Sequence, residues 1–505
     1  MTDALDALAL VRAATAQAGA GAYIGIGPAG PLWARREQAV LVLGPPRSGK
    51  TTCIVVPSIV GAPGAVVSTS TKPDVLSATV TARRRVGPCF LYDPSGTVDA
   101  PPGVERVHWS PVPGCRRWDD ALVMARNLVG SSHAGSGAAA GGYRADHWSE
   151  RAEALLGPLL HGAALDDEDF TTVLRWVDRR QLAPALAVLE SRGAEVAADL
   201  LAGIAVTDER EQSGIWSTAS GVLAGFRGEA ALASTRAPTL DSAELCAADA
   251  TLYVCATGRH QAIVAPLVVG LVADVRAAAY ARDHAARRAG TRAPAPVLLA
   301  LDEVANIAPL PDLPTVVSEG GGQGVLTLAC LQDLSQARVR WGQAADGFLS
   351  LFGTTVILPG IGDVRTLEAL AALAGDADVL TVSSSVPQPG AGGPLRAAME
   401  FAMGRGRRGG WERATITTST VRRPRLPVDV AGRGMAGRAL VVDEGNRMGW
   451  AALTPWYSTE PWRSAVSGPG LGPERGLGPE RGLGPERGLG PERGLGPERG
   501  PDLAP

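Results

Sequence analysis

Short runs of apolar residues recur in two separate parts of the chain, before residue 110 and after residue 250. Several of them are apolar at every position, as in strands that are buried on both faces of a parallel sheet. Segments with helical spacing lie between them, and this alternation predicts an α/β fold with a mostly parallel sheet. The expected strands are 39–43, 65–68, 89–92, 251–255, 297–301, 325–329, 354–358, 379–383, 413–421 and 439–442, and the helices of these parts are 5–18, 264–288 and 363–374.

Between residues 111 and 235 the strand-like runs disappear and helical spacing takes over. This change predicts an all-α domain inserted into the α/β domain, with helices at 148–165, 171–176, 183–201 and 215–226. Two Gly-rich segments, Gly19–Pro31 and Gly130–Gly142, are interpreted as a connector and a flexible loop.

The C-terminal tail repeats Gly-Leu-Gly-Pro-Glu-Arg five times from Gly470. Its Gly and Pro content cannot support a packed core, which predicts a disordered tether, with partner binding as the alternative. The expected division is therefore 1–110 (an N-terminal segment and the first part of a nucleotide-binding domain), 111–235 (the all-α insert), 236–457 (the second part of the nucleotide-binding domain) and 458–505 (the tail).

Composition limits the possible classes of protein but does not identify a function. The chain has 505 residues, 45% hydrophobic and 20% charged, which is typical of a globular protein. A net charge of −3 excludes a global electrostatic attraction to nucleic acid, so any such contact is expected in a local patch or channel. Six scattered cysteines without a CxxC pair predict reduced thiols and a cytoplasmic location. No run reaches the length of a membrane span, the nearest being 262–275.

The strand at 39–43 leads directly into the phosphate-binding motif GxxxxGKT, read as Gly44 to Thr51. Glycines allow backbone N–H groups to face phosphate oxygens, and the helix that follows adds the positive end of its dipole. Lys50 is expected on the β- and γ-phosphates and Thr51 on Mg²⁺. Lys50 is also one of only two lysines in the chain. The predicted nucleotide-binding residues are Gly44, Pro45, Arg47, Ser48, Gly49, Lys50, Thr51 and Thr52.

A second motif follows the apolar strand at 297–301, which ends on Asp302 and Glu303. Opposite a phosphate loop, Asp302 would hold the Mg²⁺ shell together with Thr51, and Glu303 would activate the attacking water. The next strand runs into Gln332, which is placed to sense the γ-phosphate; an exposed residue at a helix start is the alternative for Gln332. Lys50, Glu303 and Gln332 are the predicted catalytic residues, with ATP and Mg²⁺ as cofactors.

Four stretches resemble the TraG/VirD4 family of type IV secretion coupling proteins: the phosphate loop, Asp302–Asn306, Leu331–Gln336 with Trp341-Gly342, and Ser213–Ala219. The resemblance covers residues 38–457 and implies a RecA-like nucleotide domain, a homo-hexamer and ATP-driven transfer of DNA into a secretion or conjugation channel. It further implies single-stranded, relaxase-bound DNA or a protein as substrate, and channel components as partners. The helical insert looks like the all-α domain of that family.

Two departures from the family pattern matter. Members commonly begin with transmembrane helices, so this chain is expected either to be a soluble variant or to meet the inner face of the membrane through an anchored partner. Gly321 stands where many relatives carry an arginine that reaches a neighbour's nucleotide; Arg338 or Arg340 are the candidate substitutes, and slow or partner-activated hydrolysis is expected.

Three other interpretations stay open. The first is a double-stranded DNA translocase of the FtsK kind, and the second is the ATPase of type VII secretion. The third is a degenerate P-loop scaffold with little hydrolysis. The basic stretch Arg405–Arg438 is interpreted as a solvated loop or as a contact to a nucleic-acid backbone.

Overall fold

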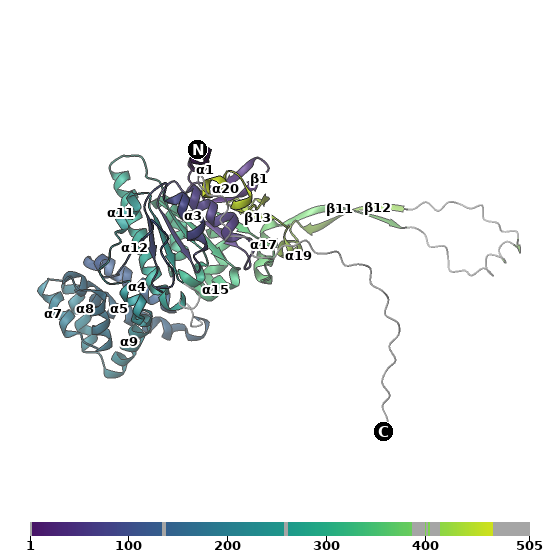
Figure 1. Ribbon diagram of the computed structural model, residues 1–505. Helices are drawn as coiled ribbons and strands as arrows, with labels where there is room; N and C mark the ends of the chain where they lie inside the picture. Colours follow the sequence, from purple (N-terminus) through teal and green to yellow (C-terminus); the bar gives the residue numbers. More distant parts are fainter. Residues whose placement is uncertain are drawn as a thin grey trace, which may run out of the picture.

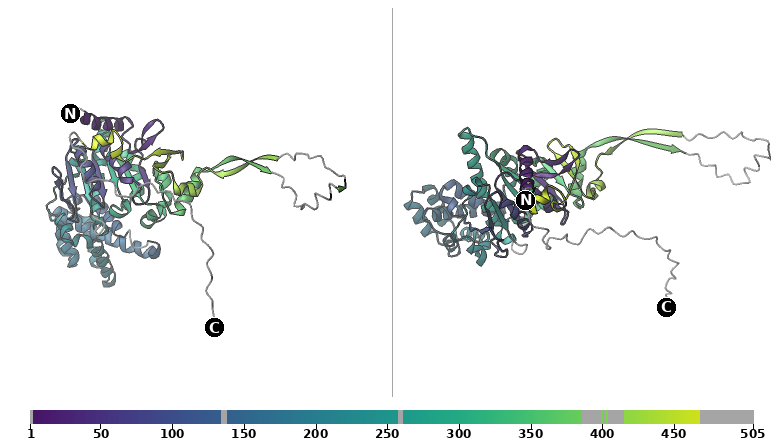
Figure 2. Two further views of the ribbon diagram at one scale, coloured as in Figure 1. Left: turned by 45° about the vertical axis from the view of Figure 1, so that its right-hand side comes forward. Right: turned by 45° about the horizontal axis from the view of Figure 1, so that its top comes forward.

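The computed structural model describes residues 3–133, 138–256, 261–385, 399, 402–403 and 415–467. A large twisted sheet occupies the centre, with helices on both of its faces (Figure 1). A group of helices lies below the sheet in this view, and a two-stranded ribbon extends from its opposite side (Figures 1 and 2). The GLGPER repeats and most of the basic stretch before residue 415 lie outside the described residues.

The main sheet contains twelve strands among the described residues, in the order β2-β1-β14-β13-β10-β3-β9-β8-β4-β7-β5-β6. The eight strands from β10 to β6 pair in parallel, and the other four form an antiparallel extension at one edge. Their bounds are β1 Tyr23–Gly27, β2 Gly30–Trp33, β3 Val40–Leu43, β4 Val66–Ser70, β5 Cys89–Tyr92, β6 Glu105–Arg106, β7 Thr251–Cys255, β8 Val297–Leu301, β9 Val325–Leu331, β10 Thr354–Ile357, β13 Arg438–Asp443 and β14 Met448–Ala452. The predicted α/β class with a mostly parallel sheet is confirmed.

Alternate residues of each central strand face two different apolar clusters, as the two-residue repeat of a strand requires. Leu41 and Leu43 pack in the apolar cluster that includes α4 (Trp118–His133) and α12 (Gln261–Arg288). Val40 and Val42 pack in a second cluster, which includes the helical segment after the phosphate loop. The helices are α1 Asp3–Gln17, α2 Val56–Gly61, α3 Asp74–Arg83, α4 Trp118–His133, α5 Ala138–Leu165, α6 Phe170–Asp178, α7 Ala183–Ser191, α8 Glu195–Ala205, α9 Glu209–Val222, α10 Glu229–Ala233, α11 Ser242–Ala247, α12 Gln261–Arg288, α13 Val304–Ile307, α14 Leu313–Glu319, α15 Leu334–Trp341, α16 Phe348–Leu351, α17 Val364–Ala374, α19 Val428–Arg433 and α20 Trp462–Ser467.

Every element that the structure describes between residues 113 and 247 is helical, as the sequence predicts. These helices share one continuous apolar cluster with the sheet, so the domain boundaries themselves stay a prediction. The stretch at 183–201 divides into α7 and α8, because Gly193 turns the chain with a φ of +71°. Within the Ser213–Ala219 motif, a Cβ at Gly214 would lie 2.3 Å from the Trp148 ring, so the motif's glycine allows α9 to pack on α5.

Helix α12 is long and strongly apolar. By length and composition its segment Ile263–Arg288 is the one described helix that could cross a membrane, yet 72% of its most apolar window is buried inside the protein. Helices α4 and α11 pack along α12. These contacts are those of a core helix.

Three expectations from the sequence are wrong in detail. The Gly130–Gly142 segment is expected to be a flexible loop, yet its described residues lie in the end of α4 and the start of α5. The Gly19–Pro31 connector contains strand β1 and the start of β2, because Ile26 pairs with Ala452 from the far end of the chain. The tail that is expected to be disordered from residue 458 contains helix α20 (Trp462–Ser467), which packs against α1 and α3 and buries Trp462. The strands expected at 379–383 and 413–421 exist as β11 (Asp376–Ser385) and β12 (Thr415–Pro424), which pair with each other outside the main sheet (Figure 1).

A buried arginine joins the elements at the N-terminal edge of the sheet. Arg83, at the end of α3, is fully buried, and its Nε donates to the Thr251 hydroxyl at 2.7 Å. Its terminal nitrogens donate to the carbonyls of Ala62 and Gly64 at 2.9 Å each and of Asp249 at 3.1 Å. Burial lowers the pKa of the guanidinium to about 10, which leaves it charged at neutral pH.

Candidate nucleotide-binding site

The phosphate loop joins β3 to a helical segment at the carboxyl edge of the parallel strands. A wide helical turn, Thr51–Val55, opens this segment and continues into α2. Gly49 has a φ of +97°, and a Cβ at Gly44 would lie 2.6 Å from Ser48 Oγ, so both positions require glycine. Arg47 also adopts a positive φ, of 63°. The loop therefore has the tight curvature that turns backbone N–H groups inward.

Lys50 is folded back onto its own loop. Its side chain is buried, and Nζ donates to the carbonyls of Gly44 and, at 3.0 Å, of Pro45. The Ser48 hydroxyl beside it is buried and has no hydrogen-bond partner among the residues that the structure describes. A buried polar atom without a partner is costly, and an anion in the loop would supply one. The loop thus fits a phosphate group.

Thr51 and Asp302 meet although 251 positions separate them in the sequence. Thr51 Oγ1 donates to Asp302 Oδ2 at 3.0 Å. Asp302 is 8% exposed, and burial raises its pKa to about 6, with Glu303 adding to the rise and Thr51 and Lys50 opposing it. A hydroxyl and a carboxylate at this distance are oxygen ligands of the kind that Mg²⁺ prefers.

Glu303 follows in a backbone conformation that is unusual for a glutamate. Its φ and ψ are +54° and +48°, in the left-handed region. Its carboxylate is half-buried and accepts a hydrogen bond from Asn306 Nδ2 at 3.4 Å. Such strain is found where surrounding structure holds a side chain in a required place, so the outlier supports a functional role for Glu303.

Strand β9 lies between β3 and β8 and is parallel to both. Leu326, Leu328 and Cys330 of β9 face the same apolar cluster as the helix after the phosphate loop. Gln332 directly follows the carboxyl end of β9, as Asp302 follows the carboxyl end of β8. The Gln332 backbone N–H donates to Gln336 Oε1 at 3.0 Å, and Asp333 caps α15. The predicted position of Gln332, beside the phosphate loop and the Asp-Glu strand, matches this topology.

The structure also bears on the remaining candidates. Thr52 Oγ1 makes a long contact of 3.5 Å to the Gly49 carbonyl, within the loop. Lys72, the other lysine, is exposed on the turn after β4. Arg338 is held by Asp346 at 2.9 Å and by Asp363 at 3.1 Å, so it is not available as a substitute for the missing arginine without breaking both pairs.

Gly321 lies far from this site, in a short turn (Gly320–Gln323) at the N-terminal edge of the sheet. A Cβ at Gly321 would lie 1.8 Å from the Glu37 backbone carbonyl. No side chain fits there unless the backbone moves. In this conformation glycine is required by packing, and an arginine at this position is sterically excluded.

Two contacts of the site were not predicted. Asn306 lies one helical turn after Glu303 and binds its carboxylate, and Gln336 binds the backbone of Gln332. The sequence contains a signal for both contacts, because Asn306 lies three residues after Glu303 and Gln336 lies four residues after Gln332.

Residues 296–428 match the family described as the TraM recognition site of TraD and TraG. No curated protein sequence matches the chain.

Solved structures of a conjugative coupling protein share the fold. TrwBdeltaN70 in its unbound monoclinic form is 16% identical, with 89% of this chain and 91% of that chain covered and a TM-score of 0.62. TrwB in complex with the non-hydrolysable ATP analogue ADPNP is also 16% identical, with coverage of 83% and 86% and a TM-score of 0.59. The resemblance to the TraG/VirD4 family is thereby confirmed at the level of the fold. The chain has the fold of the conjugative coupling protein TrwB, and its residues 296–428 match the family described as the TraM recognition site of TraD and TraG.

Proposed function

We propose that the protein is an ATP-hydrolysing motor of the conjugation coupling type, which moves DNA or relaxase-bound DNA into a type IV secretion channel. The observation that carries the proposal is the hydrogen bond between Thr51 and Asp302 at 3.0 Å, beside a phosphate loop with Lys50 at its centre. One solved structure of TrwB contains ADPNP, and a second contains ADP and Mg²⁺. The cofactors proposed here are the same, ATP and Mg²⁺.

Each residue has a role in this proposal. Lys50 exchanges its two loop carbonyls for phosphate oxygens, and the Ser48 hydroxyl gains the partner that it lacks. Thr51 and Asp302 hold the cation, which when bound neutralises charge on the phosphates. Glu303 orients and deprotonates the attacking water, and Gln332 contacts the γ-phosphate from β9.

The proposed assembly is a homo-hexamer in the cytoplasm, joined to the channel and to a membrane-anchored partner by protein contacts. The matched family is named for TraM recognition, which supports a relaxosome-type protein partner. Since an arginine at 321 is excluded by the Glu37 carbonyl, a positive charge for the transition state has to come from another element or partner. Slow basal hydrolysis that partners accelerate is the expected behaviour.

A DNA-stimulated ATPase assay tests the motor. Wild type should hydrolyse ATP in a Mg²⁺-dependent manner and faster with single-stranded DNA, whereas Lys50→Ala should lose turnover by at least about a hundredfold. Arg35→Ala is the matched control, because Arg35 is exposed on the loop before β3 and pairs only with Glu444 among the described residues. If ATP turnover did not depend on Lys50, the motor proposal would be rejected. It would also be rejected in favour of a degenerate scaffold if wild type showed no turnover with DNA and partners present.

The scaffold is the second candidate, and the observation in its favour is that the Glu37 carbonyl excludes an arginine at position 321. Nucleotide binding without turnover by wild type would support it. Translocation of double-stranded DNA in preference to a single strand would instead favour an FtsK-like motor.

A further inference from the structure

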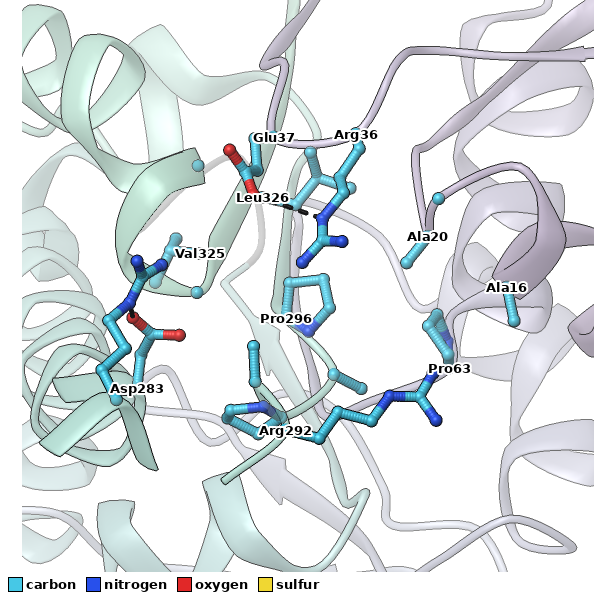
Figure 3. Close-up of a pocket in the computed structure, with 17 residues that line it drawn as sticks. Ala16, Ala20, Arg36, Glu37, Pro63, Asp283, Arg292, Pro296, Val325 and Leu326 are labelled. Carbon is cyan, nitrogen blue, oxygen red and sulfur yellow. Dashed lines mark hydrogen bonds and ion pairs between the residues drawn. The ribbon is translucent and has the colours of Figure 1, made fainter. Parts of the chain in front are cut away.

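A cavity lies at the edge of the sheet opposite the phosphate loop. Its volume is about 710 Å³. It is bounded by Leu326 and Val325 at the start of β9, by Pro296 before β8, and by the turn after α1 at Ala20 (Figure 3). Strand β9 runs from this cavity to Gln332, roughly 20 Å away at about 3.3 Å per residue. The cavity is therefore a site separate from the nucleotide site.

Arginines reach this cavity from three separate segments of the chain. Arg36 lies on the loop before β3, Arg287 in the last turn of α12, and Arg292 on the loop between α12 and β8. In Figure 3, Arg36 extends toward Pro296 from one side and Arg292 lies on the other. The three arginines therefore line the cavity from separate segments of the chain.

The two carboxylates of the cavity leave one net positive charge on its three arginines. Glu37 Oε1 accepts from Arg36 Nε at 3.2 Å, and the terminal nitrogens of Arg36 bind none of the described residues. Asp283 is buried and pairs with Arg287 at 2.5 Å. Arg292 is exposed and forms no ion pair or hydrogen bond within the described ranges. Three guanidinium groups against two carboxylates leave a net positive charge, with donors in the planar geometry that phosphate oxygens accept.

The rest of the lining is apolar and stiff. Pro63, Pro294 and Pro296 contribute rings, and Ala16 and Leu326 contribute alkyl groups. A volume within the range of roughly 300–1,000 Å³ is typical of pockets for small ligands. Apolar walls with a few charged donors suit a ligand that combines a flat, weakly polar part with an anionic part.

We propose that this cavity is a second anion site, which binds the phosphate groups of a nucleotide-sized ligand through Arg36 and Arg292. Two sources share this chemistry: a free nucleotide or polyphosphate, and a nucleotide unit of a single strand. The proposal does not depend on hydrolysis at the phosphate loop.

Isothermal titration calorimetry with inorganic tripolyphosphate, in the absence of Mg²⁺, measures the number of anion-binding sites per chain. Wild type should bind two ions per chain, and the double variant Arg36→Ala/Arg292→Ala should bind one. Lys50→Ala should lose the other ion, so that failure of the nucleotide site and failure of the cavity site are distinguishable. Arg35→Ala removes the same charge from the residue next to Arg36, outside the cavity lining, and should keep both ions.

Fluorescence anisotropy with a labelled oligo-dT 12-mer tests the single strand as the source. If the strand supplies the phosphate, the double variant should bind the oligomer at least about tenfold more weakly, and the slope of log affinity against log salt should fall by about 1.4 for two lost contacts. Loss of the tripolyphosphate ion alone would assign the site to a free polyphosphate or nucleotide. The proposal would be overturned if the double variant still bound both ions and the oligomer with wild-type affinity. It would also be overturned if wild type bound a single ion and only Lys50→Ala lost it.

Discussion

Asp302 should make the nucleotide-free protein less stable than it would be with a neutral side chain. Its carboxyl is 8% exposed and has a pKa of about 6, against an ordinary value of 3.8. The difference is about 2 pKa units, and at about 1.4 kcal/mol per unit it corresponds to an upper value of about 3 kcal/mol. Asp302→Asn keeps an acceptor for Thr51 and removes the buried charge. We therefore expect the variant to be more stable than wild type at pH 7.5, by up to about 3 kcal/mol.

The sign of the pH dependence is a stricter test. With a raised carboxyl pKa, the folded state binds more protons than the unfolded state between pH 4 and 6, so wild type loses stability as pH rises through this window. The gain from Asp302→Asn should thus be full above pH 6 and should vanish near pH 4. Urea unfolding in EDTA at several pH values measures it, with the exposed Asp199→Asn of α8 as the control. Equal midpoints at pH 7.5, or a difference that does not change with pH, would refute the reasoning.

Further predictions concern packing, each measured by thermal or urea unfolding. Gly321→Ala should cost about 1–3 kcal/mol, because its Cβ meets a backbone carbonyl at 1.8 Å, whereas Gly322→Ala in the same turn has no atom within 4 Å and should be nearly neutral; equal effects would contradict the packing. Arg83→Met should cost about 3–5 kcal/mol by leaving buried carbonyls unpaired, and Arg84→Met at the exposed neighbouring position much less. Gly214→Ala should cost about 1–3 kcal/mol where α9 packs on α5, and an unchanged midpoint would show that this contact tolerates a methyl group.

The local motifs could be predicted from the sequence because each combines a short apolar run with a few residues of fixed chemistry. The phosphate loop, the Asp-Glu strand end and Gln332 are local in this sense, and parallel pairing brings strand ends to one edge. The sequence does not show the order of the strands within the sheet. The insertion of β9 between β3 and β8 sets the distance from Gln332 to Lys50, and it depends on contacts between distant segments.

The misses have the same physical origin. Gly19–Pro31 has the composition of a connector, yet its pairing with Ala452 outweighs the low strand propensity of glycine and proline. Arg83 has the composition of a surface residue, and only the fold places five acceptors around its guanidinium. Gly321 has the appearance of a lost catalytic arginine, whereas the Glu37 carbonyl beside it shows a packing requirement.

Single-turnover hydrolysis of ATP by Glu303→Gln tests the central claim most directly. The account predicts that the variant binds ATP and Mg²⁺ as tightly as wild type, because Lys50, Thr51 and Asp302 are intact, yet cleaves the bound ATP at least about a hundredfold more slowly. Glu319→Gln, at an exposed position of α14, should cleave it at the wild-type rate. Wild-type cleavage by Glu303→Gln would contradict the account, because the strained glutamate beside Asp302 would then have no part in the chemistry.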